Sequence, residues 1–200
     1  MKISIEQLSF SYPAESGKNQ GSKQVLKDIS FSFSDQQPTV LLAPSGSGKT
    51  TLLRLLLGFL KPDSGKIEGL TSDTRISVVF QEDRLFDTMN VYENWRIAAP
   101  ALGKDEAASL CRDLGLSPAV LTQKPATLSG GMRRRAAVGR ALLFDAPVIL
   151  MDEPFQGLDD KTRDIVIRTV KERCRQKALL LITHDPEDAE KLGAKVEKLS

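Results

Sequence analysis

The eight residues from Ala43 to Thr50 constrain the fold of this chain more than any other segment. Three apolar residues precede them, as at the end of a buried strand, and a leucine-rich helical pattern follows over 50–60. A glycine-rich loop that joins a strand to a helix and ends in Lys-Thr is a place where backbone N–H groups surround phosphate. Gly46 and Gly48 allow close wrapping, and the helix adds its positive end. The segment predicts a nucleoside triphosphate site within an α/β fold.

Two residues at the end of this loop are predicted to have specific roles. Lys49 would reach the β- and γ-phosphates, and the Thr50 hydroxyl would ligate Mg²⁺. The usual pattern opens with glycine where this chain has Ala43, and alanine fits there if its φ is negative. A glycine-serine loop with an incidental lysine is disfavoured, because strand, loop and helix agree. The residues predicted to line the phosphates are Ala43, Pro44, Ser45, Gly46, Ser47, Gly48, Lys49, Thr50 and Thr51.

Composition and charge exclude several classes of protein. The 200 residues suffice for one domain, and 40% apolar and 27% charged residues are ordinary for a soluble protein. A net charge of +2 is too small to indicate nucleic acid as the main partner. The cysteines, Cys111 and Cys174, are too far apart to indicate a disulfide framework or a zinc site. No segment has the roughly 18 apolar residues of a membrane span, so we expect a cytosolic protein unless a partner brings it to a membrane.

Apolar strands alternate with helices over most of the chain, which predicts a parallel sheet covered on both faces. The expected strands are 3–8, 29–34, 40–42, 76–80, 148–151, 178–183 and one near 196, and the expected helices are 50–60, 161–177 and one from 186. An exposed loop is expected at 14–22, and the pattern from 91 to 143 is mostly helical. We expect one domain, in which 1–82 and 144–200 form an α/β core with an N-terminal antiparallel β subdomain and 83–143 form an inserted helical subdomain.

Two carboxylates follow the apolar strand at 148–151. Asp152 would lie at the carboxyl edge of the sheet, where ligands bind in α/β folds, and there it could hold the hydration shell of Mg²⁺. Glu153 could then polarise the attacking water. A strand followed by an acidic turn is common in isolation, but the phosphate loop earlier in the chain favours a hydrolytic pair.

The segment Leu128–Met132, with the sequence Leu-Ser-Gly-Gly-Met, resembles the signature motif of ABC ATPases. It precedes a helix, and a Ser-Gly-Gly loop at a helix N-terminus can itself bind an anion. The resemblance extends from Tyr12 to His184 with every motif in the family's order. The chain is therefore similar to the ATP-binding cassette of an ABC transporter, with a P-loop NTPase (RecA-like) core. The resemblance implies that the signature contacts ATP through Leu128, Ser129, Gly130 and Gly131.

The resemblance implies roles for four further residues. Gln81 matches the Q-loop glutamine, which contacts Mg²⁺ or the attacking water and senses the transmembrane partner. His184 matches the switch histidine at the γ-phosphate, and Asp159 matches the D-loop residue that communicates across the dimer. Tyr12 matches the aromatic that stacks on adenine, although a partly buried ring at a strand end is the alternative. The implied catalytic residues are Glu153, His184, Gln81 and Lys49, and the implied metal ligands are Thr50, Gln81 and Asp152.

Two positions depart from the commonest family pattern. Met132 stands where glutamine is frequent, and Gln156 stands where serine is frequent. Neither change removes a phosphate contact. The run Arg133–Arg135 is expected to form the exposed face of the signature helix.

One copy of each motif implies that ATP is held between two cassettes, in a homodimer or with a second cassette. The resemblance also implies polytopic permease subunits, whose coupling helices would bind near Gln81 and along 82–95, a solute-binding protein, and a location at the inner face of the cell membrane. The segment Val79–Leu85 resembles ATPases of the nitrate/sulfonate/taurine importers. Two alternatives are a soluble single-cassette ABC ATPase, as in iron–sulfur cluster assembly, and a regulatory module without turnover, which Glu153 and His184 disfavour.

Overall fold

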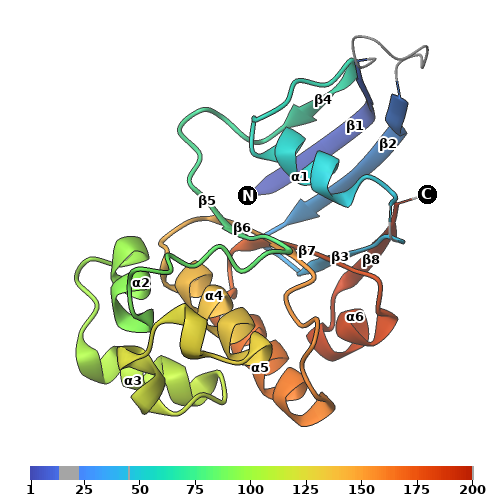
Figure 1. The fold of residues 1–200 in the computed structure, drawn as a ribbon. Coiled ribbons are helices and arrows are strands. Elements are labelled where there is room, and N and C mark those ends of the chain that lie inside the picture. Colours follow the sequence, from blue (N-terminus) through green and yellow to red (C-terminus); the bar gives the residue numbers. More distant parts are fainter. Residues whose placement is uncertain (14–22, 45, 200) are drawn as a thin grey trace.

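The computed structural model describes residues 1–13, 23–44 and 46–199, so the loop expected at 14–22 lies outside the described residues. Its strands form two sheets (Figure 1). An antiparallel sheet has the order β2-β1-β4, and a parallel sheet has the order β5-β6-β7-β3-β8. The strands are β1 Lys2–Tyr12, β2 Lys23–Ser34, β3 Thr39–Leu42, β4 Ser64–Glu68, β5 Ile76–Val79, β6 Val148–Asp152, β7 Ala178–Thr183 and β8 Lys195–Lys198.

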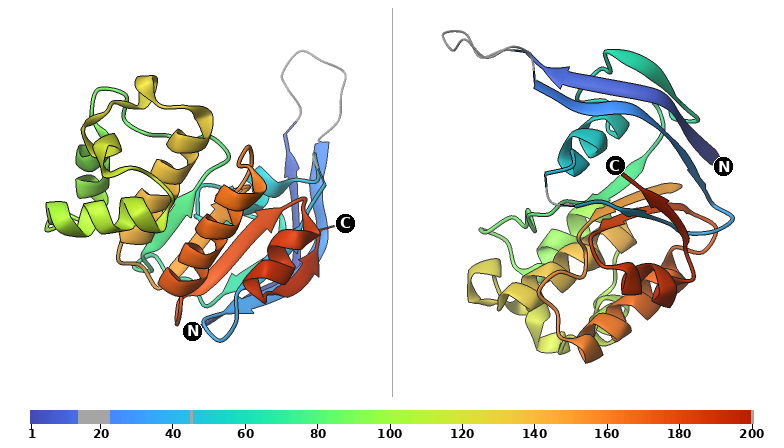
Figure 2. Two further views of the ribbon diagram at one scale, coloured as in Figure 1. Left: turned by 90° about the horizontal axis from the view of Figure 1, so that it is seen from below. Right: turned by 90° about the vertical axis from the view of Figure 1, so that its right-hand side faces the viewer.

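The helices cover both faces of the parallel sheet. They are α1 Lys49–Leu56, α2 Val91–Ala98, α3 Lys104–Asp113, α4 Gly130–Leu143, α5 Asp160–Arg173 and α6 Pro186–Leu192, with 3₁₀ turns at Pro118–Thr122 and Pro125–Thr127. The right-hand view of Figure 2 shows α1 and the antiparallel sheet on one side and the other helices on the opposite side. The predicted α/β class with an N-terminal antiparallel sheet is therefore confirmed.

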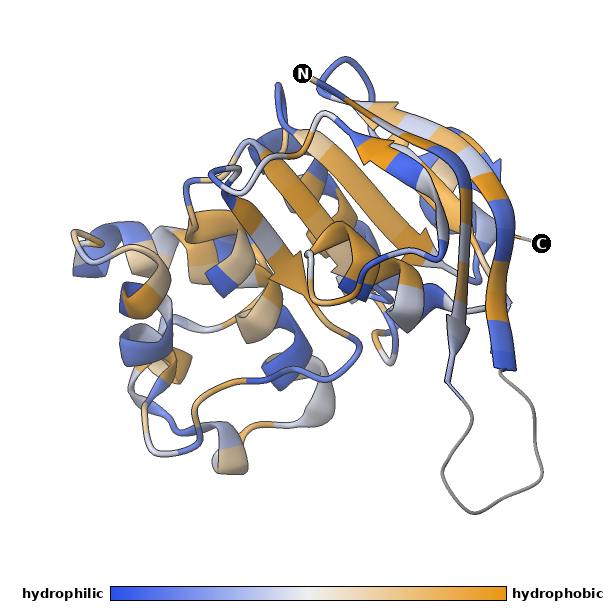
Figure 3. Ribbon diagram, turned by 90° about the horizontal axis from the view of Figure 1, so that it is seen from above, coloured by the Kyte–Doolittle hydropathy of each residue, from blue (hydrophilic) through white to orange (hydrophobic). Residues whose placement is uncertain are grey.

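Strand β6 shows why the central strands are mainly apolar. Val148 and Leu150 pack into the cluster formed by α1 and the antiparallel sheet. Ile149 and Met151 pack into the cluster on the helical side. Successive side chains of a strand point to opposite faces, so a strand covered on both faces is apolar at most positions. The central strands accordingly appear hydrophobic along their length in Figure 3.

Several elements differ from the sequence expectations. Strands β1 and β2 are longer than expected. Helix α1 ends at Leu56 rather than at residue 60, because Gly58 adopts a left-handed φ of 72°. Helix α5 ends at Arg173 rather than at residue 177, and Gln176 beyond it has a φ of 62°. Strand β4 is not among the strands expected from the sequence. Its side chains are exposed except for the half-buried Ile67, so it lacks the alternation that identifies a strand.

Helices α2 and α4 pack closely through a glycine. A Cβ at Gly139 would lie 2.5 Å from Cζ2 of Trp95, so no larger residue fits without displacing the ring. Trp95 is completely buried, and its Nε1 donates a hydrogen bond of 2.8 Å to the Ala136 carbonyl. The expectation that the segment 82–95 receives a permease is therefore wrong at its last residue, because Trp95 is part of the core.

Candidate active site

The phosphate loop begins where β3 ends. Ala43 is buried, and its N–H donates a hydrogen bond of 3.1 Å to the Thr183 carbonyl of β7. Its φ is not in the left-handed region, so alanine fits a position where glycine is usual. Ser45 lies outside the described residues. Ser47 donates through both its N–H and its Oγ to the Pro44 carbonyl, which closes the turn.

Gly48 cannot be replaced without strain. Its φ is 92°, and a Cβ there would lie 2.7 Å from Leu26 Cδ2 and 2.9 Å from Val25 Cγ1. Helix α1 begins at the next residue, and no side chain of the described residues caps its N-terminus, so its first N–H groups can bind an anion. A pocket of about 330 Å³ lies at this end of α1. It is lined by Lys23, Gln24, Val25, Gly46, Gly48, Lys49, Thr50, Thr51 and Gln81.

Three predicted catalytic residues meet beside this pocket. Lys49 Nζ lies 2.7 Å from Glu153 Oε1, and His184 Nδ1 lies 2.9 Å from Oε1 and 3.0 Å from Oε2 of the same carboxylate. The Glu153 side chain is 4% exposed, whereas that of His184 is 62% exposed. Burial by itself would raise the pKa of Glu153, but hydrogen bonds from Lys49 and His184 hold that pKa below its ordinary value.

The backbone holds Glu153 in an uncommon conformation. Its φ is 49°, and its N–H donates a hydrogen bond of 2.8 Å to the Ile182 carbonyl. A non-glycine residue in the left-handed region costs on the order of 1 kcal/mol and persists only where its surroundings enforce it. This left-handed conformation turns the chain at the carboxyl end of β6 and places the Glu153 carboxylate next to Lys49.

Asp152 has the environment of a cation ligand. It is 2% exposed, and its Oδ1 has no hydrogen-bond partner among the described residues. Burial raises the pKa of Asp152 to about 6, against the attraction of Lys49. A buried carboxylate oxygen without a donor fits Mg²⁺, which prefers oxygen ligands.

We expect Asp152→Asn to stabilise the nucleotide-free protein while it removes Mg²⁺-dependent hydrolysis. Because the folded pKa of Asp152 is raised, ionisation of Asp152 lowers the stability of the folded protein. This loss of stability is absent below pH 4, where the carboxyl is protonated, and reaches its full value above about pH 6. The gain in unfolding free energy should therefore be on the order of 2 kcal/mol at pH 8 and vanish near pH 4. Thermal melts of both proteins between pH 4 and pH 8 measure the stability gain, and the ATPase rate in Mg²⁺ measures the loss of hydrolysis. An unchanged melting temperature at pH 8 would contradict the prediction.

Tyr12 lies at the end of β1 near α1. Its hydroxyl is 3.3 Å from Thr51 Oγ1 and accepts a hydrogen bond of 3.4 Å from Arg54, and its ring packs edge-on against Phe10. This places the ring at the strand end, beside the helix of the phosphate loop. Adenine stacking by Tyr12 stays a prediction.

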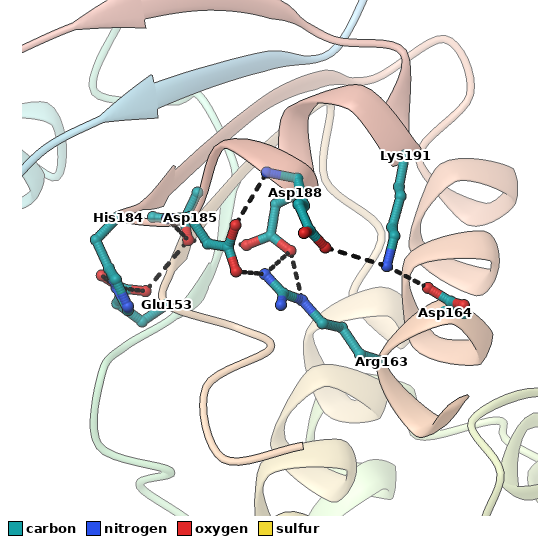
Figure 4. Close-up of polar contacts among 9 residues, drawn as sticks. Glu153, Arg163, Asp164, His184, Asp185, Asp188 and Lys191 are labelled. Atoms are coloured by element: carbon teal, nitrogen blue, oxygen red, sulfur yellow. Dashed lines mark hydrogen bonds and ion pairs between the residues drawn. The ribbon is translucent and has the colours of Figure 1, made fainter. Parts of the chain in front are cut away.

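A second layer of polar residues, which the sequence analysis missed, connects Glu153 to helix α5 (Figure 4). Thr183 Oγ1 lies 3.3 Å from Glu153 Oε2 and 2.8 Å from Asp188 Oδ2. Arg163 of α5 donates to Asp188 Oδ1 at 2.8 Å and to Asp185 Oδ2 at 2.5 Å. No local pattern could reveal this network, because Arg163 is 25 residues before Asp188 in the chain.

The signature residues lie outside the phosphate pocket of their own chain. Ser129 caps α4, with its Oγ accepting a hydrogen bond of 3.3 Å from the Met132 N–H, and Ser129 and Gly130 are exposed. Leu128 is buried, and a Cβ at Gly131 would lie 3.3 Å from Leu158 Cδ2. The signature loop is thus next to the segment before Asp159, which caps α5 by accepting a hydrogen bond of 3.0 Å from the Thr162 N–H.

The expectation that Arg133–Arg135 form an exposed face is wrong for Arg134, which is buried, while Arg135 is half-buried and the Arg133 side chain is 42% exposed. Arg134 is 7% exposed and donates to the Phe80 and Gln81 carbonyls. Arg135 donates to the Gly115 carbonyl at 2.6 Å. Their guanidinium groups bind backbone carbonyls of neighbouring segments instead of facing solvent.

The family model described as "ABC transporter" matches residues 26–156. The chain is also similar to proteins named thiamine import ATP-binding protein ThiQ. The one from Salmonella choleraesuis (strain SC-B67) is 36% identical over 173 residues, which cover 78% of this chain and 73% of that protein. The one from Chelativorans sp. (strain BNC1) is 34% identical over 206 residues, which cover 96% of this chain and 80% of that protein.

Two solved structures share the fold with a TM-score of 0.83. One, described as the dimeric structure of MJ0796, a bacterial ABC transporter cassette, is 25% identical and covers 98% of this chain and 94% of that chain. The other, a dimeric post-hydrolysis state of the same cassette bound to ADP and Pi, is 24% identical and covers 99% of this chain and 94% of that chain. Within the described part of the present chain, no helix combines the length and apolarity needed to cross a bilayer.

Proposed function

Since this chain belongs to the ABC transporter family, as an ATP-hydrolysing cassette of such a transporter, we propose that two copies hold ATP between them and thereby energise the import of a solute. The thiamine-import names of its relatives support import and favour a transporter over a soluble ABC ATPase. The nitrate/sulfonate/taurine subgroup stays a prediction.

The observation that carries the proposal is the cluster of Lys49, Glu153 and His184 beside the phosphate pocket. Lys49 forms an ion pair with Glu153 in this structure. The phosphates of ATP would attract Lys49 away from this carboxylate, because they carry more negative charge. Glu153 then accepts a proton from the attacking water as the water oxygen bonds to the γ-phosphorus and the bond to the ADP oxygen breaks. His184 would orient the carboxylate, with which it is paired at 2.9 Å, and would contact the γ-phosphate.

Asp152, Thr50 and Gln81 would hold Mg²⁺. The orphaned Oδ1 of Asp152 and the position of Thr50 and Gln81 in the wall of one pocket support this assignment. When bound, Mg²⁺ would neutralise the charge that develops on the phosphate oxygens during hydrolysis. Backbone N–H groups from Gly46 to Thr50 would bind the phosphates, and Tyr12 would stack on the adenine.

The signature loop of one subunit would complete the site of the other. In the described residues of one chain, the phosphate pocket has no lining residue from Leu128–Gly131, and Ser129 and Gly130 face solvent. Their exposed helix N-terminus can bind the γ-phosphate only if a second cassette presents it. Asp159, beside this loop, would contact the partner.

Replacing Ser129 by arginine tests the shared site. In a Glu153→Gln background, which slows hydrolysis, we expect ATP to dimerise the parent protein on size exclusion. Ser129→Arg should abolish this dimer and leave the ATP affinity of the monomer within about twofold, because the phosphate loop is unchanged. A dimer that persists with Ser129→Arg would contradict the proposal that the signature caps the partner's nucleotide.

Membrane permease subunits would bind the surface next to the Gln81 segment. A groove of about 400 Å³ is lined there mainly by apolar side chains, among them Phe80, Phe86, Ile97 and Phe144. Phe86 and Ile97 are each 50% exposed and line the same groove, and contiguous exposed apolar surface marks interaction sites. This groove lies at the junction of the core with residues 83–143, which we propose to be a helical subdomain. A solute-binding protein would deliver cargo, with the cassette at the inner face of the membrane.

A further inference from the structure

We propose that Arg134 is a positioning residue that makes the placement of Gln81 depend on the position of the signature helix α4. The inference rests on the proposed function, because it takes its meaning from the roles of Gln81 and Ser129 given above. It assigns the coupling between these two motifs to one guanidinium group.

The contacts of Arg134 are concentrated on one short segment. Its Nη1 donates a hydrogen bond of 2.8 Å to the Phe80 carbonyl, and its Nη2 donates to the Gln81 carbonyl. Its Nε lies 3.3 Å from Asp83 Oδ1, an ion pair whose geometry is not that of an aligned hydrogen bond. One planar group therefore fixes three positions of the segment 80–83, which a flexible lysine could not do.

Burial makes these contacts strong. The Arg134 side chain is 8% exposed and that of Asp83 is 23% exposed, so water screens their attraction poorly. Truncating the guanidinium would leave the Phe80 and Gln81 carbonyls without this donor. It would also leave Asp83 with only its longer ion pair to Arg133, at 3.7 Å. Buried polar groups that lose their partners are costly, so the segment would move to find new ones.

The geometry connects the two motifs mechanically. Helix α4 begins directly after Ser129, and Arg134 is in its second turn, so the two residues move together as parts of one rigid element. Strand β5 ends at Val79, so the segment that carries Gln81 has left the sheet before it reaches Arg134. Gln81 itself lines the phosphate pocket with Lys49 and Thr50. A displacement of the signature helix therefore displaces Gln81 relative to the bound nucleotide.

Arg134→Met tests this inference, because it keeps length and apolar packing but removes every donor. We expect its kcat to fall about ten- to a hundredfold, as for a misplaced catalytic group. The Mg²⁺ concentration for half-maximal rate should rise, while ATP affinity measured without Mg²⁺ stays within about twofold, since Lys49 and the loop are untouched. Arg134→Lys should be intermediate, because one ammonium group can restore the pair with Asp83 but cannot bind both carbonyls.

A double-variant cycle separates positioning from general stability. Arg134→Met should cost almost nothing further in a Gln81→Ala background, if it acts through Gln81. Arg135→Met is the matched control, because Arg135 is adjacent on α4 and donates to the backbone carbonyls of Gly131, Leu114 and Gly115 but not to the Gln81 segment. It should lower the melting temperature without raising the Mg²⁺ requirement, and any effect it has on rate should persist in the Gln81→Ala background.

The possible results distinguish a failure of the Arg134 proposal from a failure of the proposed role of Gln81. If Gln81→Ala leaves turnover unchanged, the proposed role of Gln81 fails. Two results overturn the positioning role of Arg134, provided that Gln81→Ala lowers turnover. One is that Arg134→Met has wild-type kinetics. The other is that Arg134→Met lowers kcat by the same factor in the Gln81→Ala background as in the wild type. All rates are to be taken at a temperature at which thermal melts show each variant to be folded.

Discussion

Glu153→Gln is expected to lower kcat for ATP hydrolysis by at least about a thousandfold, within the range for loss of a general base. The amide has nearly the same shape, but it cannot accept the proton of the attacking water. Lys49 also loses its charged partner at 2.7 Å, so it becomes available to the phosphates before ATP arrives. ATP affinity should therefore be equal to or higher than that of the wild type, and a stable ATP-bound dimer should appear on size exclusion.

Single-turnover hydrolysis and equilibrium ATP binding measure the two halves of this prediction. Glu153→Asp is the matched control, because it keeps the charge and withdraws the carboxylate by one methylene group. It should lose most of the turnover while keeping an ion pair with Lys49 within reach. Normal hydrolysis by Glu153→Gln would show that another group activates the water.

Lys49→Ala has the largest expected effect on nucleotide binding. Loss of the ammonium group from the phosphate pocket should weaken ATP affinity at least about a hundredfold, since each lost charge-assisted contact costs roughly 1.5–3 kcal/mol and the phosphates use more than one. The substitution has a second consequence. It leaves the 4%-exposed Glu153 carboxylate with His184 but without its cation, so the free energy of unfolding should fall on the order of 2 kcal/mol at neutral pH.

The pH dependence of that loss follows from the lowered pKa of Glu153. Because the folded pKa lies below the ordinary value of about 4.3, the pair stabilises the fold above that pH and ceases to do so as the pH falls through the folded pKa. The difference in melting temperature between wild type and Lys49→Ala should close in acid. The double variant Lys49→Ala/Glu153→Gln removes the unpaired charge, so it should regain stability but not ATP binding. Unchanged ATP affinity in Lys49→Ala would show that the phosphate loop was misidentified.

Local sequence patterns predicted the phosphate loop and the central strands because each depends on neighbours in the chain. The loop needs glycines at set positions between a strand and a helix, and both Gly46 and Gly48 adopt positive φ as expected. Strand β6 is uninterrupted and apolar because both of its faces are covered. Strand β4 was missed for the opposite reason, since an exposed edge strand leaves almost no pattern in its sequence.

The order of residues establishes which chemical groups are present: a phosphate loop, a strand ending in Asp152-Glu153, the signature residues and one histidine. How those groups are paired follows from the packing of the folded chain. It placed Lys49 on Glu153, left Asp152 Oδ1 without a donor, and buried Arg134 against the Gln81 segment. The physical reason is that ion pairs and orphaned polar atoms depend on distance and burial between segments far apart in the chain, which only packing of the sheet and its helices establishes.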